Sequence, residues 1–231
     1  MEANRPEEAL NGQTSVEVPA GGPARSRSNR DRLIKLTVTA MLTALIVLMA
    51  FTPIGYLRLG ALSITFIMVP VVVGAITVGP AAGAFLGGVF GVTSFIQCFT
   101  GDLLGSILAA ESIPKTVVLC IGSRILAGWL AGLIFKALAP RDKKSIWSSL
   151  VAALSGSLFN TLFFLGLLAL LFMRTEFTAE QAEALGGLTN VLNTVIAIAA
   201  SVNAPIEAAV CAVLGAAVSK AVFAARKQFS R

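Results

Sequence analysis

Histidine is absent from this chain of 231 residues, and so is any phosphate-binding loop. Without an imidazole the chain cannot form a Ser–His dyad, a histidine general base or a histidine-ligated zinc or haem site. No Gly-x-x-x-x-Gly-Lys-[Ser/Thr] motif occurs, so the chain does not hydrolyse ATP through a P-loop. These absences direct attention away from catalysis and towards binding or transport.

Charge is also scarce. Charged residues make up 13% of the chain and hydrophobic residues 56%, whereas soluble domains carry about 25% charged residues. Several stretches of roughly 18 or more residues are almost uncharged, and each is long enough to cross a bilayer as a helix. The composition therefore predicts an all-α, polytopic membrane protein.

The three cysteines form no Cys-x-x-Cys pair, and Cys98, Cys120 and Cys211 all fall inside apolar runs. A free cysteine in such surroundings behaves as a small core residue. We therefore expect these cysteines to pack in the core rather than to bind metal or carry redox chemistry. We expect neither a metal site nor a cofactor.

The chain divides by composition into a polar lead and an apolar body. Residues 1–32 are polar and end in a run of arginines, so they cannot bury enough apolar surface to fold alone. They also lack the short apolar run and small-residue cleavage site of a signal peptide. We expect 1–32 to be a disordered basic cytoplasmic tail, 33–225 a membrane domain, and 226–231 a short cytoplasmic tail.

Apolar runs predict the spans within the membrane domain. The first five lie at about 33–52, 62–79, 81–99, 115–138 and 147–172. The turn signal Gly79-Pro80 separates the second span from the third.

The last apolar run, from Val191 to Phe223, exceeds one span and is interrupted by Pro205. It predicts either a seventh span over 188–203, or a non-spanning segment that leads into a sixth span at about 204–224. Lys and Arg flank cytoplasmic helix ends, and six spans with the N-terminus inside place fourteen of the eighteen basic residues on that side. The other four are Arg58, Lys115 and Arg174 on the outer side, and Arg124 inside a helix.

A seventh span would move the basic C-terminus outside. Six spans with both termini cytoplasmic is therefore the better interpretation. The net charge of +6 then reflects topology and attraction to the membrane surface. A role in nucleic-acid binding would need a folded basic surface with aromatic platforms, and the sequence shows none.

Small residues recur at helical spacing in two of the predicted spans. Gly83, Gly87 and Gly91 lie four residues apart in the third span, and Gly128 and Gly132 repeat this spacing in the fourth. Such stripes let helices approach closely in lipid. We expect these glycines to pack helices within the chain.

An ionisable side chain inside a span is costly unless it is paired, so it is a functional-site hypothesis by default. Arg124 follows Lys115 by nine residues, which at about 1.5 Å per residue places it well below the outer surface. Its guanidinium offers a two-pronged fork to a carboxylate. Two interpretations remain open: an anionic ligand, or a structural role in a pair with Glu207 or in hydrogen bonds to carbonyls.

Further polar side chains lie in the middle or outer half of the predicted bundle. The amide of Asn160, in the middle of the fifth span, offers two donors and an acceptor. Asn203 and Glu207 lie near the start of the sixth span, where helix capping is an equally good explanation. The remaining candidates are Gln97, Ser94 and Tyr56. Together with Arg124, these groups suit a small anionic or zwitterionic solute in an outward-facing pocket.

Five stretches of this chain carry a resemblance to a known family. They are residues 62–75, 79–94, 123–128 (Ser-Arg-Ile-Leu-Ala-Gly), 156–161 (Gly-Ser-Leu-Phe-Asn-Thr) and 203–208 (Asn-Ala-Pro-Ile-Glu-Ala). In this order they resemble the substrate-binding S component of an energy-coupling factor (ECF) vitamin transporter, over about residues 33–225.

The resemblance implies a function in a prokaryotic cell membrane. Such S components bind a vitamin in an outward pocket formed by their fourth to sixth helices and the outer loops. They work with a membrane T component and two cytosolic ATPases, and are thought to topple in the membrane to release the vitamin inside. Ala40 and Ala44 match the family's Ala-xxx-Ala patch for the T component, although such a spacing more commonly packs helices within one chain. The basic tail is longer than the family implies.

The pair of Arg124 and Asn160 resembles the pantothenate-type members. Pantothenate also fits physically, because its carboxylate suits Arg124 and its amide and hydroxyls suit Asn160, Asn203 and Gln97. Riboflavin, thiamine and folate favour more stacking aromatics, and folate remains an alternative because it is anionic. Other function classes are a ligand-free assembly subunit and a membrane enzyme, although Glu207 is the only acid inside a proposed span.

Overall fold

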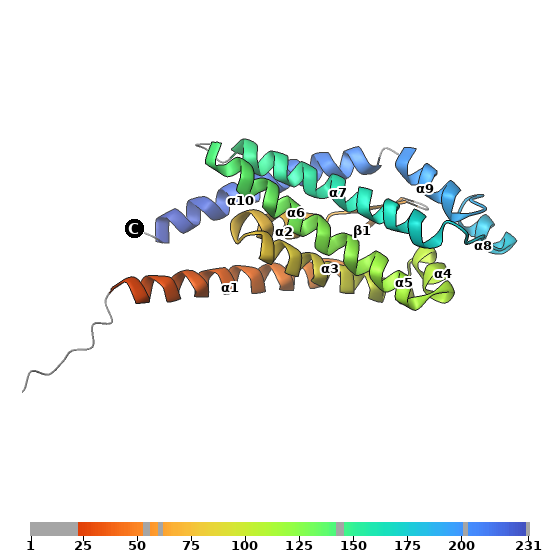
Figure 1. Cartoon of the computed structure of the whole chain (residues 1–231), viewed down its shortest axis with the longest axis horizontal. Helices are drawn as coiled ribbons and strands as arrows, with labels where there is room; N and C mark the ends of the chain where they lie inside the picture. The colour runs from red at the N-terminus through yellow and green to blue at the C-terminus, as the bar shows by residue number, and fades with distance from the viewer. Residues whose placement is uncertain (1–22, 53–55, 60–61, 142–145, 201–202, 230–231) are drawn as a thin grey trace, which may run out of the picture. The chain divides into compact units, whose positions relative to one another are not determined.

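The computed structural model describes residues 23–52, 56–59, 62–141, 146–200 and 203–229. Most of these residues are helical (Figure 1). The chain divides into two units, residues 1–34 and residues 35–231, and the packing described below lies within the second unit.

Helix α1 (Pro23–Ala50) begins ten residues before the predicted first span. Residues 23–32, which we assigned to the tail, belong to this helix, and residues 1–22 lie outside the described part. Pro23 suits the first helical position because its missing N–H would have no partner there. Once a helix exists, each further residue adds a hydrogen bond at little cost, so the apolar span can extend into the basic run.

The second predicted span is also corrected at its start. Residues 62–65 form strand β2 (Leu62–Thr65), which pairs antiparallel with β1 (Tyr56–Leu59), and helix α2 begins only at Met68 and ends at Thr77. The alternation of apolar and polar residues in Leu-Ser-Ile-Thr is a strand pattern. Our prediction of an all-α chain overlooked this short hairpin.

The other predicted spans coincide with helices. Helix α3 (Pro80–Thr100) follows the Gly79 turn, and α7 (Ile146–Phe172) matches the fifth span. The fourth span is a continuous stretch of three parts: α5 (Ile113–Val117), the π-helical turn η1 (Val118–Gly122) and α6 (Ser123–Leu138). The remaining elements are α4 (Leu103–Glu111), the 3₁₀ turn η2 (Ala139–Arg141), α8 (Ala179–Ala184), α9 (Val191–Ala200) and α10 (Asn203–Phe229).

Among the described residues, four helices are long and apolar enough to cross a membrane: 32–50, 80–100, 113–138 and 147–172. The apolar helices over 68–77 and 208–221 are shorter. The count of six spans therefore stays a prediction. In the described part of the alternative seventh span over 188–203, residues 188–190 are not helical and α9 has ten residues, or about 15 Å against a hydrocarbon core of about 30 Å. Residues 201–202 lie outside the described part.

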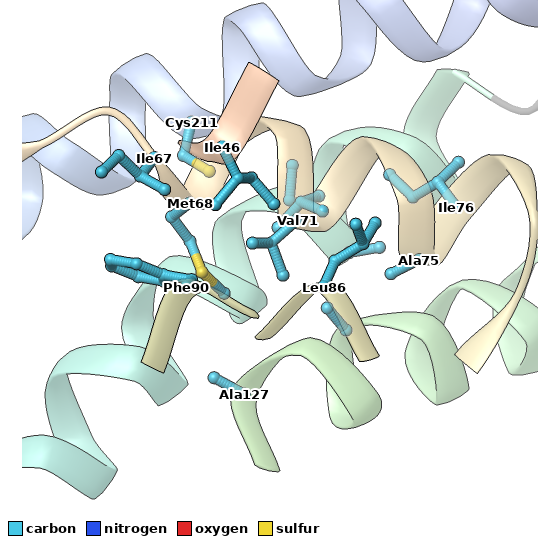
Figure 2. Close-up of a cluster of buried hydrophobic side chains, with 14 of the residues drawn as sticks. Ile46, Ile67, Met68, Val71, Ala75, Ile76, Leu86, Phe90, Ala127 and Cys211 are labelled. Atoms are coloured by element: carbon cyan, nitrogen blue, oxygen red, sulfur yellow. The ribbon is translucent and has the colours of Figure 1, made fainter. Parts of the chain in front are cut away.

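The main core lies among α2, α3, α6, α7 and α10, with the end of α1 against it. Figure 2 shows Met68 and Val71 of α2 near the centre, with Ile46, Leu86, Phe90 and Cys211 around them. A second apolar cluster joins α4, η1 and α7 to the segment around α8, and includes Leu108, Leu119, Phe172 and Leu185.

The glycine stripes pack α3 against α6, as expected. A Cβ on Gly83 would overlap the carbonyl oxygen of Gly128, and one on Gly87 would overlap that of Arg124. A Cβ on Gly91 would come within 2.6 Å of the Cα of Ile121. The two backbones therefore touch along several turns, and this contact sets the position of Arg124 relative to α3.

Candidate binding site around Arg124

Arg124 lies in the first turn of α6, directly after the π-helical turn η1. Its side chain is 8% exposed. One terminal nitrogen, Nη1, donates to the carbonyl of Cys120 at 3.1 Å and to the hydroxyl of Ser123 at 3.2 Å. The hydroxyl of Ser123 in turn donates to the carbonyl of Leu119 at 2.6 Å.

These bonds follow from the π-helical turn. Hydrogen bonds in a π turn run from residue i to residue i+5 instead of i+4, so the ladder shifts where the α-helix resumes. The side chains of Ser123 and Arg124 reach back to carbonyls of that turn, at Leu119 and Cys120. Single π turns inside α-helices are frequent at functional sites, and this one lies immediately before the buried charge.

Two aromatic rings lie against the guanidinium. The Cζ atom of Arg124 lies 4.8 Å from the ring centroid of Phe90 on α3 and 5.3 Å from that of Phe164 on α7. Cation–π contacts within about 6 Å are attractive, and more so away from water. The described contacts of the guanidinium are thus a carbonyl, a hydroxyl and two rings, with no described carboxylate among them.

Three buried polar atoms near this region have no hydrogen-bond partner among the described residues: Nε of Arg124, Oδ1 of Asn160 and Oγ of Ser157. Leaving a buried polar group without a partner costs about 1–3 kcal/mol. A native fold tolerates few such groups, and each calls for an explanation. A polar ligand that bonds to them would provide one.

Asn160 and Arg124 are brought to the same neighbourhood by Phe164. Residues four apart lie on the same face of a helix, one turn along, so Asn160 sits one turn from the ring that lies over the guanidinium. Asn160 is 8% exposed. The structure therefore combines a fixed cation with an amide oxygen that lacks a described partner. Such an arrangement can bind a ligand with both an anionic and a polar group.

The other predicted site residues are placed differently. Gln97 donates through Nε2 to the carbonyl of Ala50, so its amide ties α3 to the C-terminus of α1. Ser94 is half-buried one turn after Phe90 on α3. Tyr56 lies in β1, and Asn203 and Glu207 lie in α10, but their side chains fall outside the described residues. The alternative pairing of Arg124 with Glu207 falls outside them too.

Sequence reasoning missed Phe90, Phe164 and Ser123 as neighbours of the buried cation. The only available signal was the spacing of Phe164 four residues after Asn160. Phenylalanine is common in membrane helices, so that spacing alone did not distinguish a site from lipid-facing surface.

The cysteines lie in the core, as expected. Cys98 on α3 and Cys120 on η1 are buried, and their Sγ atoms lie 3.8 Å apart. Within the described part of the chain, no group of three or more His, Cys, Asp or Glu side chains is arranged to hold a metal ion.

Ala40 and Ala44 lie on the exposed side of α1. The buried residues of this helix are Ile46 and Ala50, whose angular positions at 100° per residue lie well away from the two alanines. Large apolar side chains near them are exposed too, including Leu36 at 67% and Leu48 at 61%. Within the described part of the chain, this alanine patch (Ala40 and Ala44) is exposed and lies away from the core.

Comparison with known proteins identifies the family. The family described as "ECF transporter, substrate-specific component" matches residues 34–219, which include all but the first two residues of the four candidate spans and both Arg124 and Asn160. The search of curated proteins found no match. Because the family match covers most of the chain, this protein belongs to the ECF transporter substrate-specific components, and is a membrane-embedded, substrate-binding transport subunit rather than an enzyme.

Proposed function

We propose that the chain captures pantothenate from outside the cell and delivers it inward through an ATP-driven ECF module. The observation that carries the proposal is the buried guanidinium of Arg124, whose Nε has no partner among the described residues. Its neighbour Phe164 lies one helical turn from Asn160, whose amide oxygen also has no described partner. Pantothenate has a carboxylate that suits the guanidinium of Arg124, and an amide and hydroxyls that suit the amide of Asn160.

The polarity of the site supports this choice over larger vitamins. The rings of Phe90 and Phe164 are engaged with the guanidinium, so they are not free to stack on a flavin or a pterin. Folate and riboflavin are therefore the second choices. Tyr56, Gln97, Ser94, Asn203 and Glu207 remain proposed ligand contacts.

The proposal includes a topology and a set of partners. Six spans with both termini cytoplasmic would place the basic residues near the start of α1 and the end of α10 on the inner side. A membrane T component and two cytosolic ATPases would supply the energy, and we place the T component on the alanine patch of α1. The protein is then located in the cell membrane of a prokaryote. It has no nucleic-acid partner in this proposal.

The test is binding of pantothenate to the purified chain in detergent or nanodiscs, without ATP, measured by isothermal titration calorimetry. We expect Arg124→Ala to weaken binding by at least about a hundredfold, because a charged partner in a buried site is worth roughly 3 kcal/mol. Lys136→Ala is the matched control, since it removes an exposed cation from the same helix.

Unchanged affinity in Arg124→Ala would refute the carboxylate assignment. If pantothenate does not bind to the wild-type chain, while folate or riboflavin does, the choice of vitamin is wrong. If no solute binds at all, the chain is an assembly subunit.

A further inference from the structure

We propose that the π-helical turn η1 and the ring of Phe164 orient the guanidinium of Arg124 so that its Nε edge faces the ligand, and that this orientation selects a carboxylate over a neutral polar group. The inference rests on the proposed function, because it explains how the same site chooses its ligand.

The hydrogen bonds of Arg124 show which part of the fork is engaged. A guanidinium has five N–H donors in one plane, and a carboxylate binds it through two parallel bonds. Nη1 already donates to Cys120 and Ser123, whereas Nε has no partner in the described part of the chain. The side of the fork that contains Nε and Nη2 is therefore the edge left for a two-pronged ligand.

The rings limit rotation of this plane. Phe164 comes from α7 and Phe90 from α3, and both centroids lie within 5.3 Å of the Cζ atom. An arginine that is already ordered loses less conformational entropy when it binds its ligand. The backbone of Arg124 is also held, because its carbonyl lies against Gly87.

Orientation matters most for a charged, planar ligand group. A carboxylate can accept both bonds from the Nε edge and gains from the low dielectric of a buried site. An alcohol at the same place accepts one bond and carries no charge. A well-oriented guanidinium therefore separates an acid from its alcohol analogue more strongly than one that rotates freely.

Phe164 is the positioning residue to test, since it is only half-buried, whereas Phe90 is fully buried in the main core. The chain offers a matched control in Phe163, which is also half-buried on α7 and stacks on Phe159 at 5.7 Å between centroids. Phe164→Leu and Phe163→Leu make the same change in volume one residue apart. Phe164→Tyr keeps the ring and serves as the rescue.

The first experiment measures the dissociation constants of pantothenate and of pantothenol, in which a hydroxymethyl group replaces the carboxylate. We expect the wild-type chain to prefer pantothenate, and Phe164→Leu to reduce that preference by about tenfold. Phe163→Leu and Phe164→Tyr should keep it. If Phe164→Leu loses affinity equally for pantothenate and pantothenol, the role of Phe164 is merely structural and the inference is overturned.

The second experiment needs no ligand. In protein labelled with ¹⁵N-arginine, the Nε–H signal that disappears in Arg124→Lys belongs to Arg124. We expect it to be protected from exchange with water in the wild type and in Phe163→Leu, and to lose protection in Phe164→Leu. A signal that exchanges freely in the wild type overturns the orientation, whereas protection without pantothenate binding leaves the orientation standing and refutes the choice of vitamin.

Discussion

Arg124 and Asn160 concentrate the polar chemistry of this chain on two neighbouring helices. Each side chain is 8% exposed, and each has a polar atom with no partner among the residues that the structure describes. A fold that only had to be stable would replace such groups with apolar residues, because unpartnered polar atoms in a core are costly. Residues retained at the expense of stability are typical of functional sites.

At the residue scale, we predict opposite effects of Asn160→Leu on stability and on binding. The substitution replaces a buried amide with an apolar side chain of similar size, so the free energy of unfolding of the ligand-free protein should rise by about 1 kcal/mol. Affinity for pantothenate should fall at least tenfold, because the amide is lost as a ligand contact. Thermal unfolding and calorimetry measure the two quantities.

Ser155→Ala is the control for this prediction. The hydroxyl of Ser155 already donates to the carbonyl of Ala152 at 3.1 Å on the same helix, so its removal should change neither quantity by much. If Asn160→Leu binds pantothenate like the wild type, then Asn160 is not part of the site.

At the scale of elements, the contact of α3 with α6 positions the buried cation. The two helices touch through backbone atoms at Gly83 and Gly87, and Gly91 extends the contact to η1. In lipid, where apolar side chains gain little from leaving the solvent, such close packing is a main source of helix association. The same contact sets how deep Arg124 lies in the bundle and in which direction its side chain extends from α6.

We predict that Gly87→Ala weakens both the fold and the site. The new Cβ would overlap the carbonyl oxygen of Arg124, and overpacking of this kind costs about 1–3 kcal/mol. The neighbouring substitution Gly88→Ala is the matched control, because its Cβ would meet only side-chain atoms of Ile125 at 3.5 and 3.7 Å, an ordinary contact. Melting temperature and pantothenate affinity should both fall in Gly87→Ala and stay near wild type in Gly88→Ala. If Gly87→Ala melts at the same temperature as the wild type, α3 can move away from α6 to accommodate the added methyl group.

Most long elements could be predicted from hydrophobic runs, but the shorter ones could not. The predicted spans at 81–99 and 147–172 match α3 and α7 within one or two residues, because the length of an apolar run in lipid leaves few alternatives to a helix. From the sequence we assigned the residues of strand β2 to a helix, because the apolar run from Leu62 onward continues into α2. Helix α4, which begins after the capping residue Asp102, was missed because nine residues do not stand out from a loop.

At the scale of the whole molecule, the chain presents an apolar face on α1 that its own core does not cover. Only 11% of the span over 32–50 is buried, and the alanine patch lies on the exposed side. Small residues allow another helix to approach closely, whereas lipid gains nothing from them. We therefore place the contact with the T component there.

We predict that Ala40→Leu/Ala44→Leu disrupts assembly with the ECF module without changing pantothenate affinity. The added side chains would hold a partner helix away from α1, while Arg124 and its neighbours are on other helices. Co-purification with the T component measures assembly, and calorimetry on the isolated chain measures binding. The control is Ala81→Leu, at an exposed alanine on α3, which should alter neither assembly nor pantothenate affinity. If the double variant still assembles with the T component, the interface does not lie at Ala40 and Ala44.

The sequence alone determined that this protein is a membrane protein and that Arg124 and Asn160 are polar residues within its predicted spans, because a bilayer penalises every charge and every unpaired polar group. Only the tertiary structure decided which way the arginine faces. Its Nη1 is held by Cys120 and Ser123, and its plane lies over rings from two other helices. Such contacts depend on how helices distant in sequence pack together, and hydrophobic periodicity within one helix carries no information about its neighbours.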